Sequence, residues 1–533
     1  MTTGTITPYR SGLEAGRDGF AQLLRAEWTK FRTVRGWVIG MVVVALVTVL
    51  IGLLTASGSH CSANGRTCQP PAVPVGPDGE AVSDSFYFVH QALAGDGSIT
   101  VRVSSLTALI PPLTVGAHAG QGQGPLTGAR PGLQPWTKAG IIVKENTSQG
   151  SAYAAIVVTG GHGVRMQYNY THDKAGLAGG VSAASPRWLR LTRAGDTLTG
   201  EESTDGTHWT TVGTVHLAGL PATVQAGLFV ASPGYSQLSQ HFGGSTGTGG
   251  PTQATAAFDQ VSLQGNWPSG AWRAEAMGAS GAGDPSLDRY TQAGGTFTVS
   301  GSGDIAPVVV GTGGAGPGQP VERVLVGVFA GLIAVIVVGA MFITAEYRRG
   351  LIRTTLAASP RRGRVLVAKT IVIGSVAFVA GLVAAAVALP LGTRILRANG
   401  SLVLPVPPLT ALRVIAGTAA LLAVAAVLAL AVGAVLRRGA AAVTAGIVAI
   451  VLPYILATAY VLPTGPSQWL LRLTPAAAFA IQQSIPQYPQ VSNDYTPVSG
   501  YYPLAPWAGF AVLCAWAALA LGLAVFLLRR RDA

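Results

Sequence analysis

The sequence is poor in charged residues. Only 11% of its 533 residues are Asp, Glu, Lys or Arg, whereas a soluble globular chain carries about 25%. Hydrophobic residues make up 49%. The shortage of charge indicates that much of the chain lies in a bilayer, and the length leaves room for a further domain.

Six long runs contain no Asp, Glu, Lys, Arg or His. A helix that crosses the hydrocarbon core needs about 20 apolar residues, and six stretches qualify: 37–55, 324–345, 370–390, 414–436, 440–462 and 507–528. Proton- and voltage-coupled transporters need ionisable groups inside the membrane, so the pattern argues against a proton-driven pump. It leaves a passive channel open. The first run follows 36 residues, too many for the start of a signal peptide, and is predicted to be an uncleaved anchor.

The sequence also lacks recognisable motifs for nucleotide binding and catalysis. A P-loop needs Gly-x-x-x-x-Gly-Lys-Ser/Thr, and no Gly-Lys pair occurs; His-Glu-x-x-His and Cys-x-x-Cys are absent as well. We therefore expect no enzymatic activity and no cofactor, and any ATP-driven process needs a separate ATPase. Cys61 and Cys68 follow the first run and are candidates for a disulfide in an oxidising compartment. Cys514 is expected to be a packed apolar residue.

The net charge of +13 is concentrated beside the apolar runs. Residues 56–323 hold 13 basic and 16 acidic residues, so the basic balance is a topology signal and argues against nucleic-acid binding. Cytoplasmic loops are enriched in Lys and Arg. Four segments hold 18 of the 35 basic residues: 10–35, 348–369, 437–438 and 529–531. We predict a multi-pass plasma-membrane protein with both termini inside and residues 56–323 outside.

Residues 19–37 are predicted to form an amphipathic helix before the first span. Its apolar stripe repeats at helical spacing and consists of Phe20, Leu23, Leu24, Trp28 and Phe31. Arg25, Lys30 and Arg32 lie largely off the stripe. Such a helix lies in the headgroup layer of a bilayer. An ordinary cytoplasmic cap helix is the alternative.

The segment between the first two spans has the pattern of a β-sandwich. Short alternating runs separated by turn residues predict strands at 98–103, 139–143, 152–158, 164–168, 188–192, 197–201, 224–230 and 256–263. Residues 56–81, 243–252 and 311–319 are rich in Gly, Pro or Ser and are interpreted as linkers. In 295–305, Phe297 and Val299 alternate with polar residues, which predicts one more strand that packs into the sandwich. A juxtamembrane linker is the alternative for that stretch.

The loop 346–369 carries the most informative pattern. It begins Glu346-Tyr347-Arg348-Arg349-Gly350, continues to Ser359-Pro360-Arg361-Arg362, and ends at Ala368-Lys369. It resembles the first cytoplasmic loop of type-2 ABC exporter permeases, and residues 24–35 are similar to the elbow helix of that family. The resemblance implies a short coupling helix that docks on a separate ATP-binding-cassette ATPase. The coupling residues it implies are Glu346, Arg349, Arg353, Thr355, Leu356, Pro360 and Arg362. It also implies a homodimer or a pairing with a related permease. A solvated basic cap is the alternative for the loop.

The insert departs from that family, in which the corresponding loop is short. Residues 136–141, 187–193, 203–209 and 258–261 resemble a concanavalin-like, laminin-G-like jelly roll. Such folds often bind sugars, which makes Trp136, Trp188 and Trp209 candidates for stacking on an extracellular glycan. Packing in the core or at an edge is the alternative for these rings. A segment like 295–305 comes first in the jelly-roll family but last here, as in a circular permutation.

These observations predict an α-helical polytopic membrane protein with an all-β sandwich inserted between spans one and two. The expected domains are an arm with span one (1–55), a linker (56–81), the sandwich (82–265), a second linker (266–320), and spans two to six (321–533). The favoured function is the permease subunit of an ATP-driven exporter whose outer domain acts as a lid, sensor or glycan-binding module. A membrane-anchored carbohydrate-binding or structural surface protein, and less readily a channel, are the alternatives.

Overall fold

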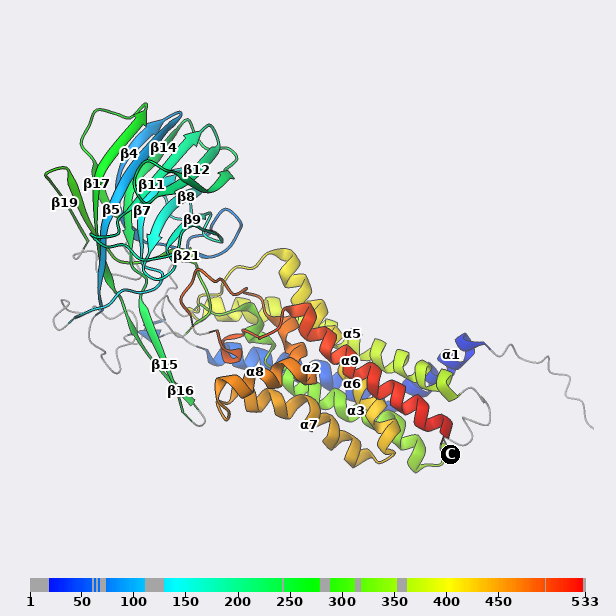
Figure 1. Cartoon of the computed structure of the whole chain (residues 1–533). Helices are drawn as coiled ribbons and strands as arrows, with labels where there is room; N and C mark the ends of the chain where they lie inside the picture. Colours follow the sequence, from blue (N-terminus) through cyan, green and yellow to red (C-terminus); the bar gives the residue numbers. More distant parts are fainter. Residues whose placement is uncertain are drawn as a thin grey trace, which may run out of the picture.

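The chain forms a long helical bundle with a β domain at one end (Figure 1). A computed structural model describes residues 19–59, 62–63, 66–67, 73–110, 129–241, 244–278, 288–311, 318–351, 362–493 and 495–530. In chain order, α1 and α2 come first, the strands follow, and the remaining helices complete the bundle. We call residues 82–307 the β domain.

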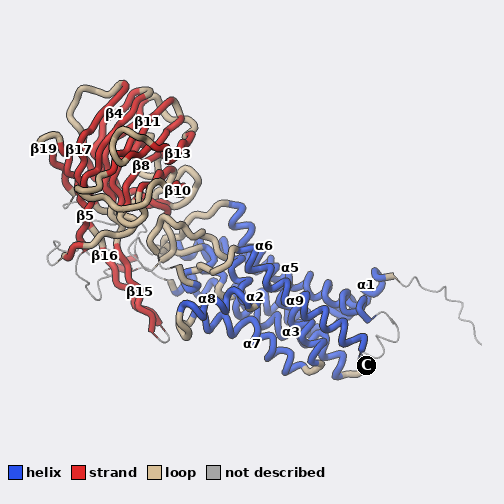
Figure 2. The backbone as a smooth tube through the Cα atoms, in the orientation of Figure 1, coloured by secondary structure: helices blue, strands red, loops and turns tan. Residues whose placement is uncertain are grey.

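Six helices of the described chain are long and apolar enough to cross a membrane. They lie side by side along the bundle (Figure 2). These helices are α2 (Arg35–Gly58), α3 (Val328–Arg348), α5 (Arg362–Ala398), α6 (Pro408–Leu436), α7 (Gly439–Thr458) and α9 (Pro506–Arg530). Each overlaps one of the six apolar runs, with ends that differ by up to eight residues. The largest shift is in α5, which extends eight residues beyond the run at each end.

Helix α5 continues beyond the proline at which the third run was expected to end. It passes through Pro390 and reaches Ala398, for 37 residues in all, or roughly 55 Å. Pro390 lacks an N–H and therefore cannot donate to the preceding turn. Thr393 Oγ1 donates to the carbonyl oxygens of Leu389 at 2.8 Å and Pro390 at 3.2 Å.

The short helices lie at the two ends of the bundle. Helix α1 (Phe20–Thr33) precedes α2. A single residue with an extended backbone, Val34, separates the two helices. At the other end are η2 (Val321–Leu325), α8 (Thr464–Leu473), η3 (Pro475–Gln482) and η4 (Pro497–Ser499). All eight residues of η3 are buried, and the segment packs against α6 and α9.

The β domain contains two antiparallel sheets. The seven-stranded sheet has the order β10-β9-β8-β7-β14-β4-β18, and the second sheet has the order β13-β12-β11-β5-β17-β20-β19, with β6 paired to β5. The first sheet comprises β4 (Phe86–Ala94), β7 (Lys138–Lys144), β8 (Tyr153–Thr159), β9 (Val164–Tyr168), β10 (His172–Ala175), β14 (Thr223–Ala231) and β18 (Arg273–Met277). The second comprises β5 (Gly97–Ile110), β6 (Arg130–Pro131), β11 (Arg187–Ala194), β12 (Thr197–Ser203), β13 (Thr210–His216), β17 (Gln253–Gly265), β19 (Arg289–Ala293) and β20 (Thr296–Gly301).

Three pairs of short strands lie outside these sheets. They are β1 (Ser62–Ala63) with β2 (Arg66–Thr67), β15 (Tyr235–His241) with β16 (Gly244–Gly250), and β3 (Val82–Asp84) with β21 (Ile305–Pro307). The last pair joins the beginning and the end of the β domain. It therefore holds the two ends of the insert together.

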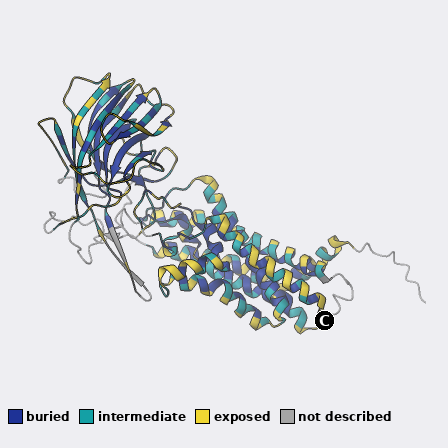
Figure 3. Ribbon diagram, viewed as in Figure 1, coloured by how far each residue is buried: buried dark blue, intermediate teal, exposed yellow. Residues whose placement is uncertain are grey.

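The core of the β domain lies between the two sheets. Alternate residues of β5 point inward, so that Ile99, Val101 and Val103 are buried together with Phe258 of β17. Strands β7 and β8 are buried on both faces, because Phe86, Phe88 and other residues form a second cluster on the outer side of their sheet. Figure 3 shows this concentration of buried residues in the strands and along the inner faces of the helices.

Two stretches interpreted as linkers contain strands. Residues 243–252 include β16, and residues 266–320 include β18 to β21. Strand β20 lies where a strand was expected over 295–305, and Phe297 faces Phe258 across the β17–β20 pair. Strand β16 consists of Gly, Ser and Thr alone, and β18 to β21 are three to six residues long, so these strands become stable only when paired with a neighbour.

Candidate functional site

Four charged side chains meet at the end of the bundle far from the β domain. Lys369 Nζ lies 2.6 Å from Glu27 Oε2 and 2.6 Å from Glu346 Oε1. Lys30 Nζ lies 2.7 Å from Glu27 Oε1 and 3.4 Å from Glu346 Oε1. The side chains of Lys369 and Glu27 are fully buried. We call these four residues the ion cluster; two cations balance two carboxylates.

The ion cluster joins three helices that are distant in sequence. Glu27 and Lys30 are on α1, Glu346 is in the last turn of α3, and Lys369 is near the beginning of α5. The ring of Phe342 lies 5.0 Å below the Lys369 ammonium and packs edge-on against Phe31 of α1 at 6.0 Å. A displacement of α1, of the end of α3 or of the beginning of α5 would therefore shift the other two elements as well.

Attraction between the lysines and the carboxylates of the ion cluster opposes the free-energy cost of burying their charges. Burial opposes the charge of Lys30, but the carboxylates of Glu27 and Glu346 outweigh it and raise the pKa of Lys30 above its usual value. Removing one member of a buried ion pair leaves its partner uncompensated and costs about 3–5 kcal/mol. The cluster therefore fixes the geometry at the two ends of the loop 346–369.

The predicted coupling residues fall partly within the described chain. Glu346 belongs to the ion cluster, and Arg349 is exposed just after α3. Arg362 is the first residue of α5. Arg353, Thr355, Leu356 and Pro360 lie outside the described residues, as do Cys61 and Cys68.

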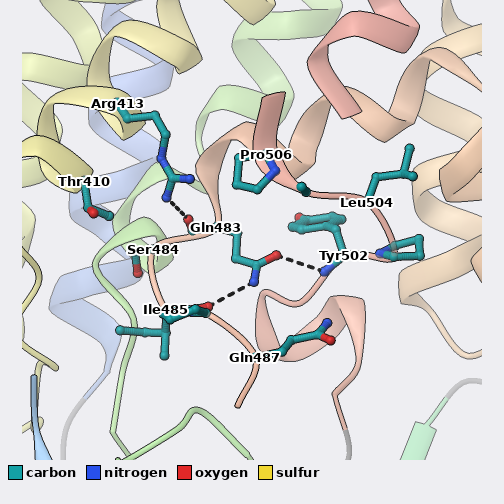
Figure 4. Close-up of a pocket in the computed structure, with 12 residues that line it drawn as sticks. Thr410, Arg413, Gln483, Ser484, Ile485, Gln487, Tyr502, Leu504 and Pro506 are labelled. Atoms are coloured by element: carbon teal, nitrogen blue, oxygen red, sulfur yellow. Dashed lines mark hydrogen bonds between the residues drawn. The ribbon is translucent and has the colours of Figure 1, made fainter. Parts of the chain in front are cut away.

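A polar pocket opens at the opposite end of the bundle (Figure 4). Its volume is about 420 Å³, and it is lined by the start of α6, the loop after η3 and the segment before α9. Arg413 Nη2 donates to the carbonyl oxygen of Gln483 at 2.5 Å. The Gln483 side chain donates to the carbonyl oxygen of Ile485 at 3.0 Å and accepts from the Tyr502 N–H at 3.2 Å. The glutamine therefore ties the two loops of the pocket together.

A carboxyl group lies beside this pocket. Glu322 Oε1 accepts a hydrogen bond from the backbone N–H of Ser484 at 3.1 Å. Burial raises the pKa of Glu322 to about 7, although hydrogen bonds from Ser484 and the charge of Arg413 act in the opposite direction. The group therefore changes its charge near neutral pH.

A second cavity of about 340 Å³ separates the bundle from the β domain. Asp78, Glu80 and His172 line one side, and the segment 404–407 lines the other; Thr410 and Ser484 line both this cavity and the pocket of Figure 4. The two hollows therefore adjoin. Among the described residues, only the second cavity also contacts the β domain, through Thr171 and His172.

Direct hydrogen bonds hold the β domain and the segment that follows it over these hollows. The side chain of Gln490, in the loop between η3 and α9, donates to the carbonyl oxygen of Thr171 at 2.9 Å. The Val310 N–H donates to the Tyr501 hydroxyl at 2.9 Å, and Asn493 donates to the carbonyl oxygen of Val310 at 3.0 Å. The same loop therefore contacts the pocket and the β domain.

The three candidate glycan-stacking tryptophans are buried or partly covered by neighbouring side chains. Trp136 is only 5% exposed and stacks on His162 with ring centroids 4.0 Å apart. Trp188 and Trp209 are partly exposed, and the guanidinium groups of Arg102 and Arg190 lie over them at 5.8 and 3.7 Å. Glycan stacking stays a prediction, and the partly exposed Trp188 and Trp209 suit it better than Trp136.

Sequence reasoning missed Glu27 as a partner of Lys369, and it missed the pocket around Arg413. The signal for the first was a lone acidic residue within a basic amphipathic arm. No comparable signal marked Gln483, because its role depends on a loop that returns to α6. Cys514 is a free, partly buried cysteine in α9.

Comparison with known proteins matches residues 195–533 to a family described as ABC-2 family transporter protein. No curated protein matches the chain. A solved structure of a functionally unknown protein from Saccharomyces cerevisiae is 16% identical over 40% of this chain and 93% of that chain, with a TM-score of 0.21. Scytalido-glutamic peptidase with a peptide-based transition state analog is 9% identical over 41% of this chain and 98% of that chain, also with a TM-score of 0.21. TM-scores of this size do not establish a shared fold.

Proposed function

The chain belongs to the ABC-2 transporter family as a multi-pass membrane permease, and from this premise we propose that it is the permease of an ATP-driven exporter. Permeases of this family normally work with an ATP-binding-cassette subunit. The ion cluster carries the proposal, because a motion at the loop 346–369 reaches α1, α3 and α5 through it.

We place the ion cluster and both termini on the cytoplasmic side. The arginines that close α3, α6 and α9 lie at this end of the bundle (Figure 1), as the excess of positive charge in cytoplasmic loops requires. The β domain then lies outside the cell. The separate ATPase would dock on the loop 346–369, and two permease units, either identical or related, would complete the transporter.

In this arrangement the β domain acts as a lid on the outer end of the pathway. The loop 483–506 supports that role, since it lines the pocket beside Arg413 and also contacts Thr171 of the β domain through Gln490. A change at the pocket would be transmitted to the β domain through this loop. The domain would therefore move with the outer ends of α6 and α9.

Co-purification tests the ATPase pairing. A tagged chain, extracted from its native membrane after mild cross-linking, is expected to retain an ATP-binding-cassette subunit. Glu346→Lys should reduce the recovered subunit, because it places a third cation beside Lys369 and Lys30. Glu145→Lys makes the same charge change in the β domain and serves as the control. Recovery of no nucleotide-binding subunit, or equal recovery with Glu346→Lys, would contradict the proposal.

A further inference from the structure

An apolar groove runs between α5 and α9 near the end of the bundle that carries the ion cluster. Its volume is about 290 Å³, and its lining includes Val367 and Ile371 of α5 and Leu521, Gly522 and Val525 of α9. Thr370 also lines it, but its hydroxyl donates to the carbonyl oxygen of Leu366 at 2.9 Å. The side chains that line the groove are therefore hydrocarbon, and the one hydroxyl among them already has a hydrogen-bond partner.

Arginines extend both walls of the groove toward the same end. Arg364 precedes Val367 by three residues and Ile371 by seven, and Arg529 follows Val525 by four residues. Helical residues at these spacings share a face. A Cβ placed on Gly363 would lie 3.8 Å from Val525 Cγ1 and 4.0 Å from Arg529 Nη2, so the Arg529 guanidinium lies beside the first turn of α5. The hydrocarbon groove therefore has a cationic mouth.

The charges at this mouth are exposed and lack a carboxylate in the described chain. Arg364 and Arg529 are exposed. None of the ion pairs among the described residues includes either of them. The N-terminus of α5 adds its partial positive charge at the same place. Arg364, Arg529 and the N-terminus of α5 would therefore all attract an anionic group.

We propose that this groove binds an anionic phospholipid, with one acyl chain along Val367, Ile371 and Gly522 and the phosphate against Arg364 and Arg529. Basic pockets beside transmembrane helices bind anionic headgroups, and here the hydrocarbon wall continues directly below the cations. A free phosphate would leave that wall unused. A second copy of the chain in the same orientation would bring its own arginines to the same level, where like charges repel.

Lipid binding by the purified full-length chain tests the charged half of the site. Native mass spectrometry would compare phosphatidylglycerol with phosphatidylcholine carrying identical acyl chains. Each arginine is expected to favour the anionic lipid about fivefold. The double variant Arg364→Gln/Arg529→Gln should therefore lose most of the preference for phosphatidylglycerol. Arg438→Gln, which changes an exposed arginine before α7, should keep it.

Gly522→Leu tests the hydrocarbon half of the site. A Cβ on Gly522 meets no atom within 4 Å, so the leucine enters the open groove without a clash and leaves both arginines in place. Phosphatidylglycerol binding should fall at least as far as in the double arginine variant. Gly36→Leu is the matched control, because Gly36 of α2 is equally open.

Three results would overturn the lipid site. The first is equal binding of the two lipids by the unchanged chain. The second is full phosphatidylglycerol binding by Gly522→Leu with unchanged oligomeric mass, which would reduce the site to attraction of headgroups without a groove. The third is a Gly522→Leu variant that changes the oligomeric mass but not lipid binding, which would assign the groove to a second copy. None of these measurements involves the ATPase.

Discussion

Lys369 is the buried cation of the ion cluster. It is fully buried and contacts two carboxylates from different helices at 2.6 Å. Lys30, by contrast, is 41% exposed and reaches the same carboxylates from the solvent side. Their different burial leads to different expectations for substitution.

Lys369→Met should lower the free energy of unfolding by about 3–5 kcal/mol, because Glu27 and Glu346 would lose their buried cation. Lys30→Met should cost about 0–1 kcal/mol, as expected for a partly exposed pair. Thermal unfolding of the detergent-solubilised chain would measure both. Adding Glu27→Gln to Lys369→Met should recover part of the loss. Equal stability of the Lys369→Met variant and the unchanged chain would show that the cluster is not coupled to folding.

Glu322 should make stability depend on pH. Its folded pKa of about 7 lies above the usual value of 4.5, so the folded state binds the proton more tightly than the unfolded state. The stabilising contribution is complete below pH 4.5 and is lost as the pH rises to 7, a change of about 3 kcal/mol at most. Glu322→Gln should flatten this slope in denaturant unfolding. An unchanged slope with Glu322→Gln would assign the pH dependence to other groups.

At the residue scale, sequence predicted Glu346 and the loop that contains it, but not the partners of Glu346. The charge of Lys369 lies one residue before an apolar run, a position at which a solvated lysine is equally plausible. Its burial depends on α1 folding back over the ends of α3 and α5. Such a contact spans 342 residues between Glu27 and Lys369, and local patterns carry no information about it.

Among the elements, strands β18 to β21 decide where the β domain ends. Met277, Phe297, Val299 and Ile305 are each at most 5% exposed, and β20 pairs with β17 in the second sheet. Buried ion pairs hold the flanking segments, since Lys144 contacts Asp84 at 2.7 Å and Lys138 contacts Asp304 at 2.8 Å. These strands are therefore structural parts of the domain.

A fragment of residues 82–307 should fold alone and give a β-type circular dichroism spectrum with a cooperative melt. A fragment of residues 82–265 should not, because it lacks four buried apolar side chains worth about 1.5–3 kcal/mol each. That loss is comparable with the whole stability of a typical domain, about 5–15 kcal/mol. Equal melting temperatures for the two fragments would show that β18 to β21 are dispensable.

Elements were predictable where the pattern was long and regular. Each of the six apolar runs overlaps one long helix, and seven of the eight predicted strand segments lie within strands, while the eighth starts one residue before β8. The short strands β18, β19 and β21 escaped because three to five residues carry too little alternation to recognise. The longer strands β4 and β13 were not predicted either. The end of α5 was misplaced at Pro390, because the helix passes through this proline and continues to Ala398.

At the scale of the whole molecule, the family match confirms the permease prediction, while the orientation stays a prediction that labelling can test. In a background without the three native cysteines, Thr207→Cys in the β domain should react with an impermeant maleimide in intact cells. Arg438→Cys should react only after permeabilisation. Both residues are exposed. Labelling of Arg438→Cys in intact cells would invert the proposed topology.

ATP hydrolysis by the assembled transporter tests the central claim most directly. The chain and its ATP-binding-cassette subunit would be reconstituted together in liposomes, with Lys369→Gln compared with the unchanged chain and with Lys30→Gln. The purified chain alone should hydrolyse no ATP, and the complex should hydrolyse it faster than the isolated subunit. Lys369→Gln should abolish that stimulation, whereas Lys30→Gln should preserve most of it. Hydrolysis by the chain alone, or stimulation unaffected by Lys369→Gln, would contradict coupling through the ion cluster.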